Sequence, residues 1–169
     1  PGVAGEKMMN YPRERLDVLL DEHAPEGWQM AFHVNGDIGL DIVLDAFGRA
    51  LDKHQLLGTD HRWRVEHVGG ARGAQFRRAA SLGVVASMGP FQYYYWGDLL
   101  DGELFSTETG AGWQRFRDAF DAGVHPSFHN DGSVSPPTPL LNVQTAVTRR
   151  TSSGAVHGPD QAATLWEAL

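Results

Sequence analysis

The sequence contains no cysteine in its 169 residues. A disulfide framework is therefore excluded, and so is a metal site built from thiolates. A metal ion bound by this protein would have to be held by histidine imidazoles and by carboxylates.

Positive charge and long apolar runs are also scarce. The sequence has 14 Lys and Arg against 21 Asp and Glu, a formal net charge of -7, and its basic residues are scattered along the chain. Nucleic acid is therefore not an expected partner. No apolar run approaches the roughly 18 to 20 residues that a spanning helix requires, so we expect no membrane partner.

The first residues, Pro1 to Gly5, include no initiator methionine and no charged-then-apolar signal pattern. We expect a cytoplasmic protein, and we expect this chain to be a fragment, truncated at both ends. A hydrophobic fraction of 41% and a charged fraction of 21% are typical of a globular protein with one core. The sequence thus predicts a single domain over residues 1–169.

Short strand patterns alternate with helical patterns along the chain. The predicted strands are Trp28–His33, Arg62–His67, Val84–Ser87 and Val124–Phe128. The predicted helices are one from Tyr11 that ends before Pro25, then Ile38–Lys53, Gln75–Leu82, Trp113–Asp121, Leu140–Arg149 and Pro159–Leu169. This alternation predicts an α/β fold with a parallel sheet covered by helices. A complete TIM-type (β/α)8 barrel needs about 250 residues, so four parallel βα units predict a partial barrel, about half of one.

The segment from Met88 to Gly112 is rich in aromatic residues and shows no regular period. Long irregular segments in compact domains are usually functional lids or disordered segments. We therefore expect a loop here. Two interpretations of it stay open, a wall of the substrate pocket and a surface that packs on the missing half of the barrel.

Three of the predicted strands end in possible metal ligands. His33 ends the first, His67 ends the second, and Asp131 follows the last in the turn Asn130-Asp131-Gly132. In a barrel of parallel strands, the carboxyl ends meet at one mouth, where the active site lies. Two imidazoles and one carboxylate suit zinc or a similar divalent ion. The sequence therefore predicts a metal site formed by His33, His67 and Asp131.

These segments, taken together, resemble the amidohydrolase superfamily. The residues that carry the resemblance are His33-Val34-Asn35-Gly36-Asp37, Val43-Leu44-Asp45-Ala46, His61-Arg62, Arg64-Val65-Glu66-His67, Leu82-Gly83-Val84, Ala122-Gly123-Val124, the Asp131 turn, Pro139-Leu140, Ala146-Val147-Thr148-Arg149 and Glu167-Ala168-Leu169. Their order and spacing are similar to the amidohydrolase family 3 group, which is typified by N-substituted formamide deformylases. The resemblance extends from about Pro12 to the end of the sequence.

The resemblance implies a metal-dependent hydrolase that cleaves carbon-nitrogen bonds other than peptide bonds, in a small amide-type substrate, through a metal-activated water. His33, His67 and Asp131 would bind the metal ion, expected to be zinc, after the fifth, sixth and eighth strands of the barrel. Asp131 would also be the catalytic general base and pass the proton to the leaving nitrogen. The four units would form the second half of the barrel, and we expect the fragment alone to be inactive.

The sequence also departs from the family pattern. No His-x-His pair occurs, and the turn at Asp131 has His129 before it, where the family more often has Gly-Ser-Asp. His129 could be a substitute ligand, although a packing role is favoured. Asp37 is interpreted as a helix N-cap and Arg149 as structural. Arg64 and Glu66 could contact His67, or they could pack or form an ion pair with a neighbouring unit of the barrel.

Two other interpretations remain. The chain could be a non-catalytic half-barrel that self-associates as a homo-oligomer or pairs with the missing half, because the outer strands of half a barrel have unpaired edges. It could also be a phosphoester-cleaving member of the same superfamily, since the same metal site can activate water toward phosphorus.

Overall fold

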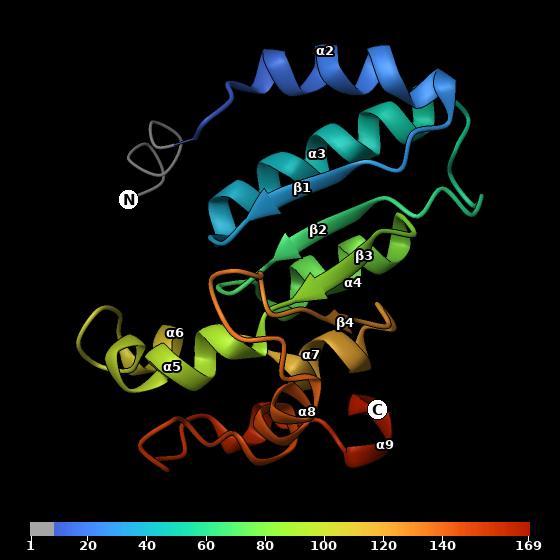
Figure 1. Ribbon diagram of the computed structural model, residues 1–169. Helices are drawn as coiled ribbons and strands as arrows, with labels where there is room; N and C mark the ends of the chain where they lie inside the picture. The colour runs from blue at the N-terminus through green and yellow to red at the C-terminus, as the bar shows by residue number, and fades with distance from the viewer. Residues whose placement is uncertain (1–8) are drawn as a thin grey trace.

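The computed structural model describes residues 9–169, so the sequence start at Pro1–Gly5 lies outside the described residues. Its sheet has four strands in the order β1-β2-β3-β4, and each neighbouring pair is parallel (Figure 1). The strands are β1 (Ala31–Val34), β2 (Arg64–His67), β3 (Val85–Met88) and β4 (Ser127–Phe128). The predicted parallel α/β architecture is confirmed.

Helices precede β1, connect the strands and continue the chain after β4. They are α2 (Arg13–His23), α3 (Asp37–Lys53), α4 (Gly73–Ser81), α5 (Pro90–Leu100), α6 (Thr107–Gly110), α7 (Phe116–Asp121), α8 (Pro139–Thr148) and α9 (Leu165–Ala168), with 3-10 turns at Ala24–Glu26 and Pro159–Gln161. Within residues 9–169, none of the helices is long and apolar enough to cross a membrane.

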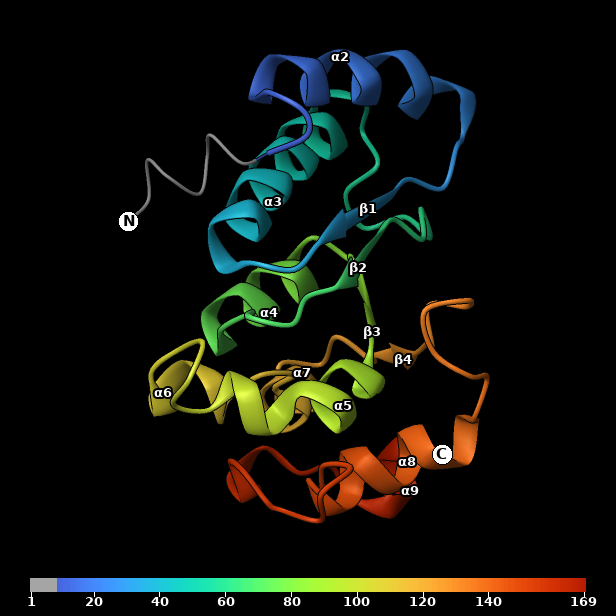
Figure 2. The same cartoon turned by 60° about the vertical axis from the view of Figure 1, so that its left-hand side comes forward.

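The two faces of the sheet differ in polarity. Register pairs Phe32 with Val65 and Val65 with Ala86, so these apolar side chains share one face. Helices α3 and α4 lie on that side of the strands (Figure 2), and α3 buries an apolar stripe that includes Leu44 and Phe47. The hydrophobic core therefore lies between the sheet and these helices, which leaves the other face for polar residues.

The observed strands are shorter than the predicted ones. The predicted strand Trp28–His33 begins at Ala31 in the structure, and Trp28 is exposed. The predicted strand Val124–Phe128 is reduced to two residues. Its first half is broken because His125 has a left-handed backbone, with φ of 51°, and Pro126 follows it.

The prediction of a loop over Met88–Gly112 is wrong, because most of this segment is helical. Helix α5 begins with Pro90 at its first position, where a missing N–H has no cost. Phe91 and Tyr93 are buried, whereas Tyr95 and Trp96 are partly exposed. Aromatic residues therefore occupy both sides of the helix, and the apolar period that would have identified it is absent.

The predicted continuous helix Pro159–Leu169 is also wrong. The chain forms a 3-10 turn, becomes extended at Ala162 with ψ of 140°, and starts α9 only after Thr164. The backbone N–H of Ala163 donates to the carbonyl of Ala146 in α8, which breaks the helical ladder. Leu165 and Trp166, which a continuous amphipathic helix would place on its apolar face, are 58% and 88% exposed.

Arg149 has the structural role that the sequence suggested. Its fully buried guanidinium donates to the carbonyls of Ala111, Trp113, Gln114 and His157 at 2.7 to 3.2 Å. The guanidinium carbon lies 3.7 Å from the centroid of the Tyr93 ring, a cation-π contact. Burial lowers the pKa of Arg149 to about 10, so the side chain stays charged at neutral pH. One cation therefore holds together loops that are distant in sequence.

A second polar cluster joins α5 to the loop after α8. The His157 Nδ1 lies 2.7 Å from Asp101 Oδ2, and its Nε2 lies 2.9 Å from Asp98 Oδ1. Since carboxylates only accept hydrogen bonds, both contacts require a doubly protonated imidazole. Burial alone would lower the pKa of His157, but the hydrogen bonds to Asp98 and Asp101 outweigh it and raise that pKa above its ordinary value of 6.5.

We expect Arg149→Met to lower the free energy of unfolding by about 3 kcal/mol or more, because several buried carbonyls lose a charged donor at once. The measurement is equilibrium denaturation in urea. Arg150→Met is the control, because Arg150 is exposed and, within residues 9–169, its guanidinium donates only to the carbonyl of Gly154. This substitution should change the free energy of unfolding by less than about 1 kcal/mol. Equal effects of the two substitutions would contradict the role of Arg149.

The cluster at His157 predicts a pH dependence of stability. Because the folded-state pKa is raised, the contribution of His157 is complete below pH 6.5 and is lost as the pH rises through the folded-state pKa. The difference in unfolding free energy between the wild type and His157→Gln should therefore shrink from slightly acidic to alkaline pH. Urea denaturation across this range measures it, and a difference independent of pH would refute the charged bridge.

Candidate functional site

The structure brings the three predicted ligands to one cavity. His33, His67 and Asp131 all line a cavity of about 750 Å³ on the polar face of the sheet. His33 and His67 come from the adjacent strands β1 and β2, and their ring centroids are 4.4 Å apart. The convergence expected at the carboxyl ends of parallel strands is thus present in the geometry.

His67 is the buried member of this group. Its backbone has a φ of 72°, so the strand ends there with a sharp change of direction. Burial, together with smaller effects of the nearby His129 and His33, lowers the pKa of His67 to about 4. The imidazole is therefore neutral at physiological pH, the state in which a histidine nitrogen can bind a metal ion.

His129 packs against His67, with 4.8 Å between the ring centroids. Its Nδ1 accepts the backbone N–H of Asp131 at 3.2 Å. Burial lowers the pKa of His129, which favours the neutral ring. His129 thus packs on His67 and supports the Asp131 turn, while its buried Nε2 has no hydrogen-bond partner among the described residues.

Asp131 is exposed at the rim of the cavity and has a left-handed backbone, with φ of 48°. The preceding residue anchors the turn to α8, because Asn130 Oδ1 accepts from Asn142 Nδ2 at 2.9 Å. Ser135 closes the other side of the loop by donating from Oγ to the carbonyl of Asn130 at 2.7 Å. Asp131 thus presents a free carboxylate from a loop fixed on both sides.

Polar side chains cover the floor of the cavity. Arg64 and Glu66 on β2 form an ion pair with each other, within one strand and not with a neighbouring unit. Burial raises the pKa of Glu66, but hydrogen bonds from Ser87 and Arg64 outweigh it and lower that pKa. Glu66 is therefore a carboxylate at neutral pH, fixed next to His33 by the register of β1 and β2.

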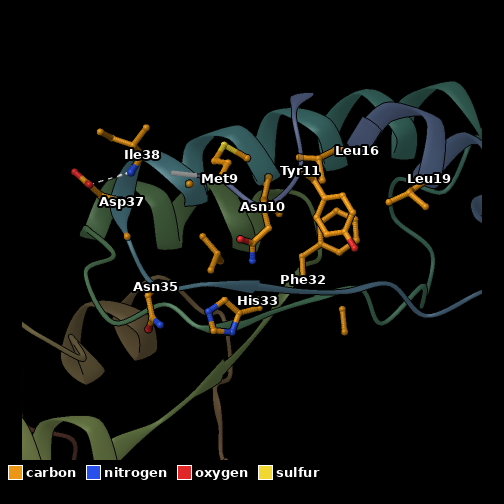
Figure 3. Close-up of a pocket in the computed structure, with 15 residues that line it drawn as sticks. Met9, Asn10, Tyr11, Leu16, Leu19, Phe32, His33, Asn35, Asp37 and Ile38 are labelled. Atoms are coloured by element: carbon orange, nitrogen blue, oxygen red, sulfur yellow. Dashed lines mark hydrogen bonds between the residues drawn. The ribbon is translucent and has the colours of Figure 1, made fainter. Parts of the chain in front are cut away.

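His33 also borders a second cavity, of about 600 Å³, between β1 and the helices above it (Figure 3). Apolar residues such as Tyr11, Leu16 and Phe32 dominate its lining. Asp37 lies at the rim as the first residue of α3, where its Oδ1 accepts the N–H of Ile38 at 2.9 Å, and it forms an ion pair with Arg72. The N-cap residue is Gly36, so the prediction for Asp37 was one position off.

Sequence reasoning missed a group of buried amides behind His67. Gln92 on α5 contacts the His67 ring, and Gln114 donates from Nε2 to the His67 carbonyl at 3.0 Å. Both glutamines are buried. The sequence offers a signal for Gln92 alone, which lies inside the aromatic run Phe91-Gln92-Tyr93. The signal is weak because glutamine side chains are usually exposed.

The donor set suits a divalent ion in its chemistry, since two imidazoles and an aspartate side chain line one polar cavity. In the arrangement described for residues 9–169, however, no group of three or more His, Asp or Glu side chains is close enough to hold an ion. His33, His67 and Asp131 therefore share a cavity without forming a coordination shell among themselves.

Comparison with known proteins agrees with this geometry. The chain is 33% identical over 164 residues to an N-substituted formamide deformylase from Arthrobacter pascens, an alignment that covers 94% of this chain and 29% of that protein. The chain thus spans less than a third of its relative.

Two solved structures are similar in fold. An uncharacterized metal-dependent hydrolase from Pyrococcus horikoshii OT3 matches with a TM-score of 0.75 and 27% identity, over 94% of this chain and 31% of that one. An uncharacterized metal-dependent hydrolase from Pyrococcus furiosus matches with a TM-score of 0.71 and 25% identity, over 95% of this chain and 30% of that one. The four βα units are therefore part of a TIM-type barrel.

A model of the amidohydrolase family matches residues 4–169, nearly the whole sequence. The match includes the strands that carry His33 and His67 and the turn that carries Asp131. The chain belongs to the amidohydrolase family.

Proposed function

We propose that this chain supplies one part of the active site of a metal-dependent hydrolase that cleaves carbon-nitrogen bonds other than peptide bonds. The observation that carries the proposal is the meeting of His33, His67 and Asp131 at one polar cavity in a chain of this family. His33 and His67 would bind the metal ion through their imidazoles, and Asp131 through its carboxylate. We propose zinc, because imidazole with carboxylate is a common ligand set of catalytic zinc.

The three residues would have different roles. A bound divalent ion supplies Lewis-acid activation of water near neutral pH. Asp131, exposed at the rim, would accept the proton of the attacking water and deliver it to the leaving nitrogen. His67 can bind an ion at neutral pH without first losing a positive charge, because its pKa is about 4.

The name of the similar Arthrobacter protein supports the proposed substrate class more directly than the shape of the cavity does. The similar Arthrobacter protein is named for deformylation of N-substituted formamides, and we propose a small amide of this type as substrate. The apolar cavity beside His33 would hold the substituent on nitrogen, since Tyr11, Leu16 and Phe32 provide an apolar surface next to the ligand.

The edges of the sheet support a second proposal. In the described sheet, β1 and β4 each have one neighbour, so one edge of each strand is open to pairing. We propose that these edges pair with the remaining strands of a barrel. Self-association of two copies through the same edges is the alternative, and it would give a half-barrel without catalysis.

Zinc binding tests the ligand assignment directly. We expect His67→Ala to weaken zinc binding by at least about 10-fold, because one ligand is lost while the fold keeps its other contacts. Isothermal titration with zinc chloride measures the affinity. His125→Ala is the control, since His125 is exposed before β4 and does not line the cavity. Equal affinities for the two variants would overturn the assignment of His67.

Catalysis tests the role of Asp131. In the active protein that contains this sequence, Asp131→Asn should lower kcat for an N-alkyl formamide by about 10²- to 10⁴-fold, because the amide cannot accept the proton. Formate release measures the rate, and Asp121→Asn, an exposed position on α7, is the matched control. Unchanged kcat in Asp131→Asn would exclude Asp131 as the general base.

A further inference from the structure

Residues 151–157 form a strap that follows α8 and fastens the chain to α5. The backbone N–H of Ser152 donates to the carbonyl of Tyr94 on α5 at 2.8 Å. The hydroxyl of Thr151 donates to Asp98 Oδ1, also on α5, at 2.9 Å. One backbone contact and one carboxylate therefore hold the first residues of the strap in place.

The ring of His157, at the end of the strap, contacts two carboxylates of α5. Its Nε2 lies 2.9 Å from Asp98 Oδ1, the atom that Thr151 also contacts, and its Nδ1 lies 2.7 Å from Asp101 Oδ2. Asp98 and Asp101 are three positions apart at the end of α5, so their like charges are neighbours and repel each other. His157 is the only cationic residue of the strap, and its charged ring offsets this repulsion.

Within residues 9–169, two further titratable groups face His157, and both contact its backbone instead of its ring. The Tyr93 hydroxyl of α5 accepts the His157 N–H at 2.9 Å, and the Arg149 guanidinium at the end of α8 donates to the His157 carbonyl at 3.2 Å. The state of the ring is therefore determined mainly by the two carboxylates.

The two carboxylates differ in their other partners. Asp98 also accepts hydrogen bonds from Thr151 and Ser153, and its side chain is 41% exposed. The Asp101 side chain is 15% exposed, has its one hydrogen bond among the described residues with His157, and has a buried Oδ1 without a partner. Loss of one ring proton should therefore break the contact to Asp98, which has other donors and water, and spare the contact to Asp101.

A neutral ring cannot keep both contacts, because its unprotonated nitrogen would face a carboxylate oxygen and neither atom could donate. Asp98 must then turn away from His157, which withdraws the acceptor of Thr151. We propose that His157 and Asp98 form a pH-operated latch, closed when the imidazole is charged and open when it is neutral, which controls whether the strap stays docked on α5. This inference does not depend on the proposed function.

Opening of the latch leaves the rest of the fold in place. Arg149 loses the His157 carbonyl but keeps its three other carbonyl acceptors. The Tyr93 hydroxyl has one proton for two carbonyls, and without His157 it can still donate to the carbonyl of Arg149 at 2.8 Å. We therefore expect a local opening of the strap and no global unfolding.

The latch should open above the ordinary pKa of histidine. Burial lowers the pKa of His157, but the hydrogen bonds to Asp98 and Asp101 outweigh burial and raise that pKa above 6.5. The latch is therefore closed below pH 6.5 and opens as the pH rises through the folded-state pKa.

The test begins with the wild-type 169-residue chain. Two-bond ¹H–¹⁵N correlation NMR follows both ring nitrogens of His157, and hydrogen exchange follows the backbone N–H of Ser152. As the pH rises, we expect the proton to leave Nε2 and stay on Nδ1, while the protection factor of Ser152 falls by about 5-fold or more. The N–H of Ala163, which donates to the carbonyl of Ala146 outside the strap, is the internal control and should keep its protection factor.

Asp98→Asn separates the latch from a general effect of pH. Its amide NH2 can donate to the unprotonated Nε2 of His157, so the strap should stay docked and the fall in Ser152 protection should disappear. Asp52→Asn, at an exposed position of α3, is the matched control and should keep the wild-type fall.

Three results would each overturn the inference. The first is loss of the proton from Nδ1 of His157 before Nε2, and the second is a Ser152 protection factor that does not change with pH in the wild type. Neither of these measurements needs a variant. The third is a fall in Ser152 protection that persists in a folded Asp98→Asn.

Discussion

The buried guanidinium of Arg149 is the interaction on which the site depends. It binds the carbonyls of Ala111, Trp113 and Gln114, and so it fixes the backbone of the loop between α6 and α7. That loop supplies the indole and the amide that orient Gln92. Because Gln92 contacts His67, a residue near the end of α8 supports the candidate ligand through two layers of hydrogen bonds. A change at Arg149 would therefore affect the site without touching it.

The candidate site also depends on the imidazole of His67 remaining neutral. His67 lies between His33 and His129, with ring separations of 4.4 and 4.8 Å. Two adjacent imidazolium ions would repel each other in a poorly solvated region. Burial and the neighbouring rings prevent this by lowering the pKa of His67. The same close packing that makes a positive charge on His67 unfavourable keeps its ring neutral, and a neutral imidazole is the form that binds a metal ion.

The sequence predicted those features that depend on local pattern. Alternating strands and helices gave the parallel order, and the position of His33 and His67 at strand ends placed both residues at one cavity. Helix α5 was not predicted, because aromatic residues on all its sides hide the 3.6-residue period. The amide network was not predictable either, since Asn35, Gln92 and Gln114 are distant in sequence and no pattern links them.

Gly69 illustrates how a local signal can have a distant cause. Its sequence context, Gly69-Gly70 after His67, indicates only that the strand ends. In the structure the Trp113 ring packs directly on Gly69, and a Cβ atom at this position would overlap the ring. The backbone N–H of Gln114 also donates to the Gly69 carbonyl at 2.8 Å. The glycine therefore admits the indole that donates to Gln92. Because Gln92 contacts the His67 ring, the absence of a side chain at position 69 supports the packing behind a residue only two positions earlier in the sequence.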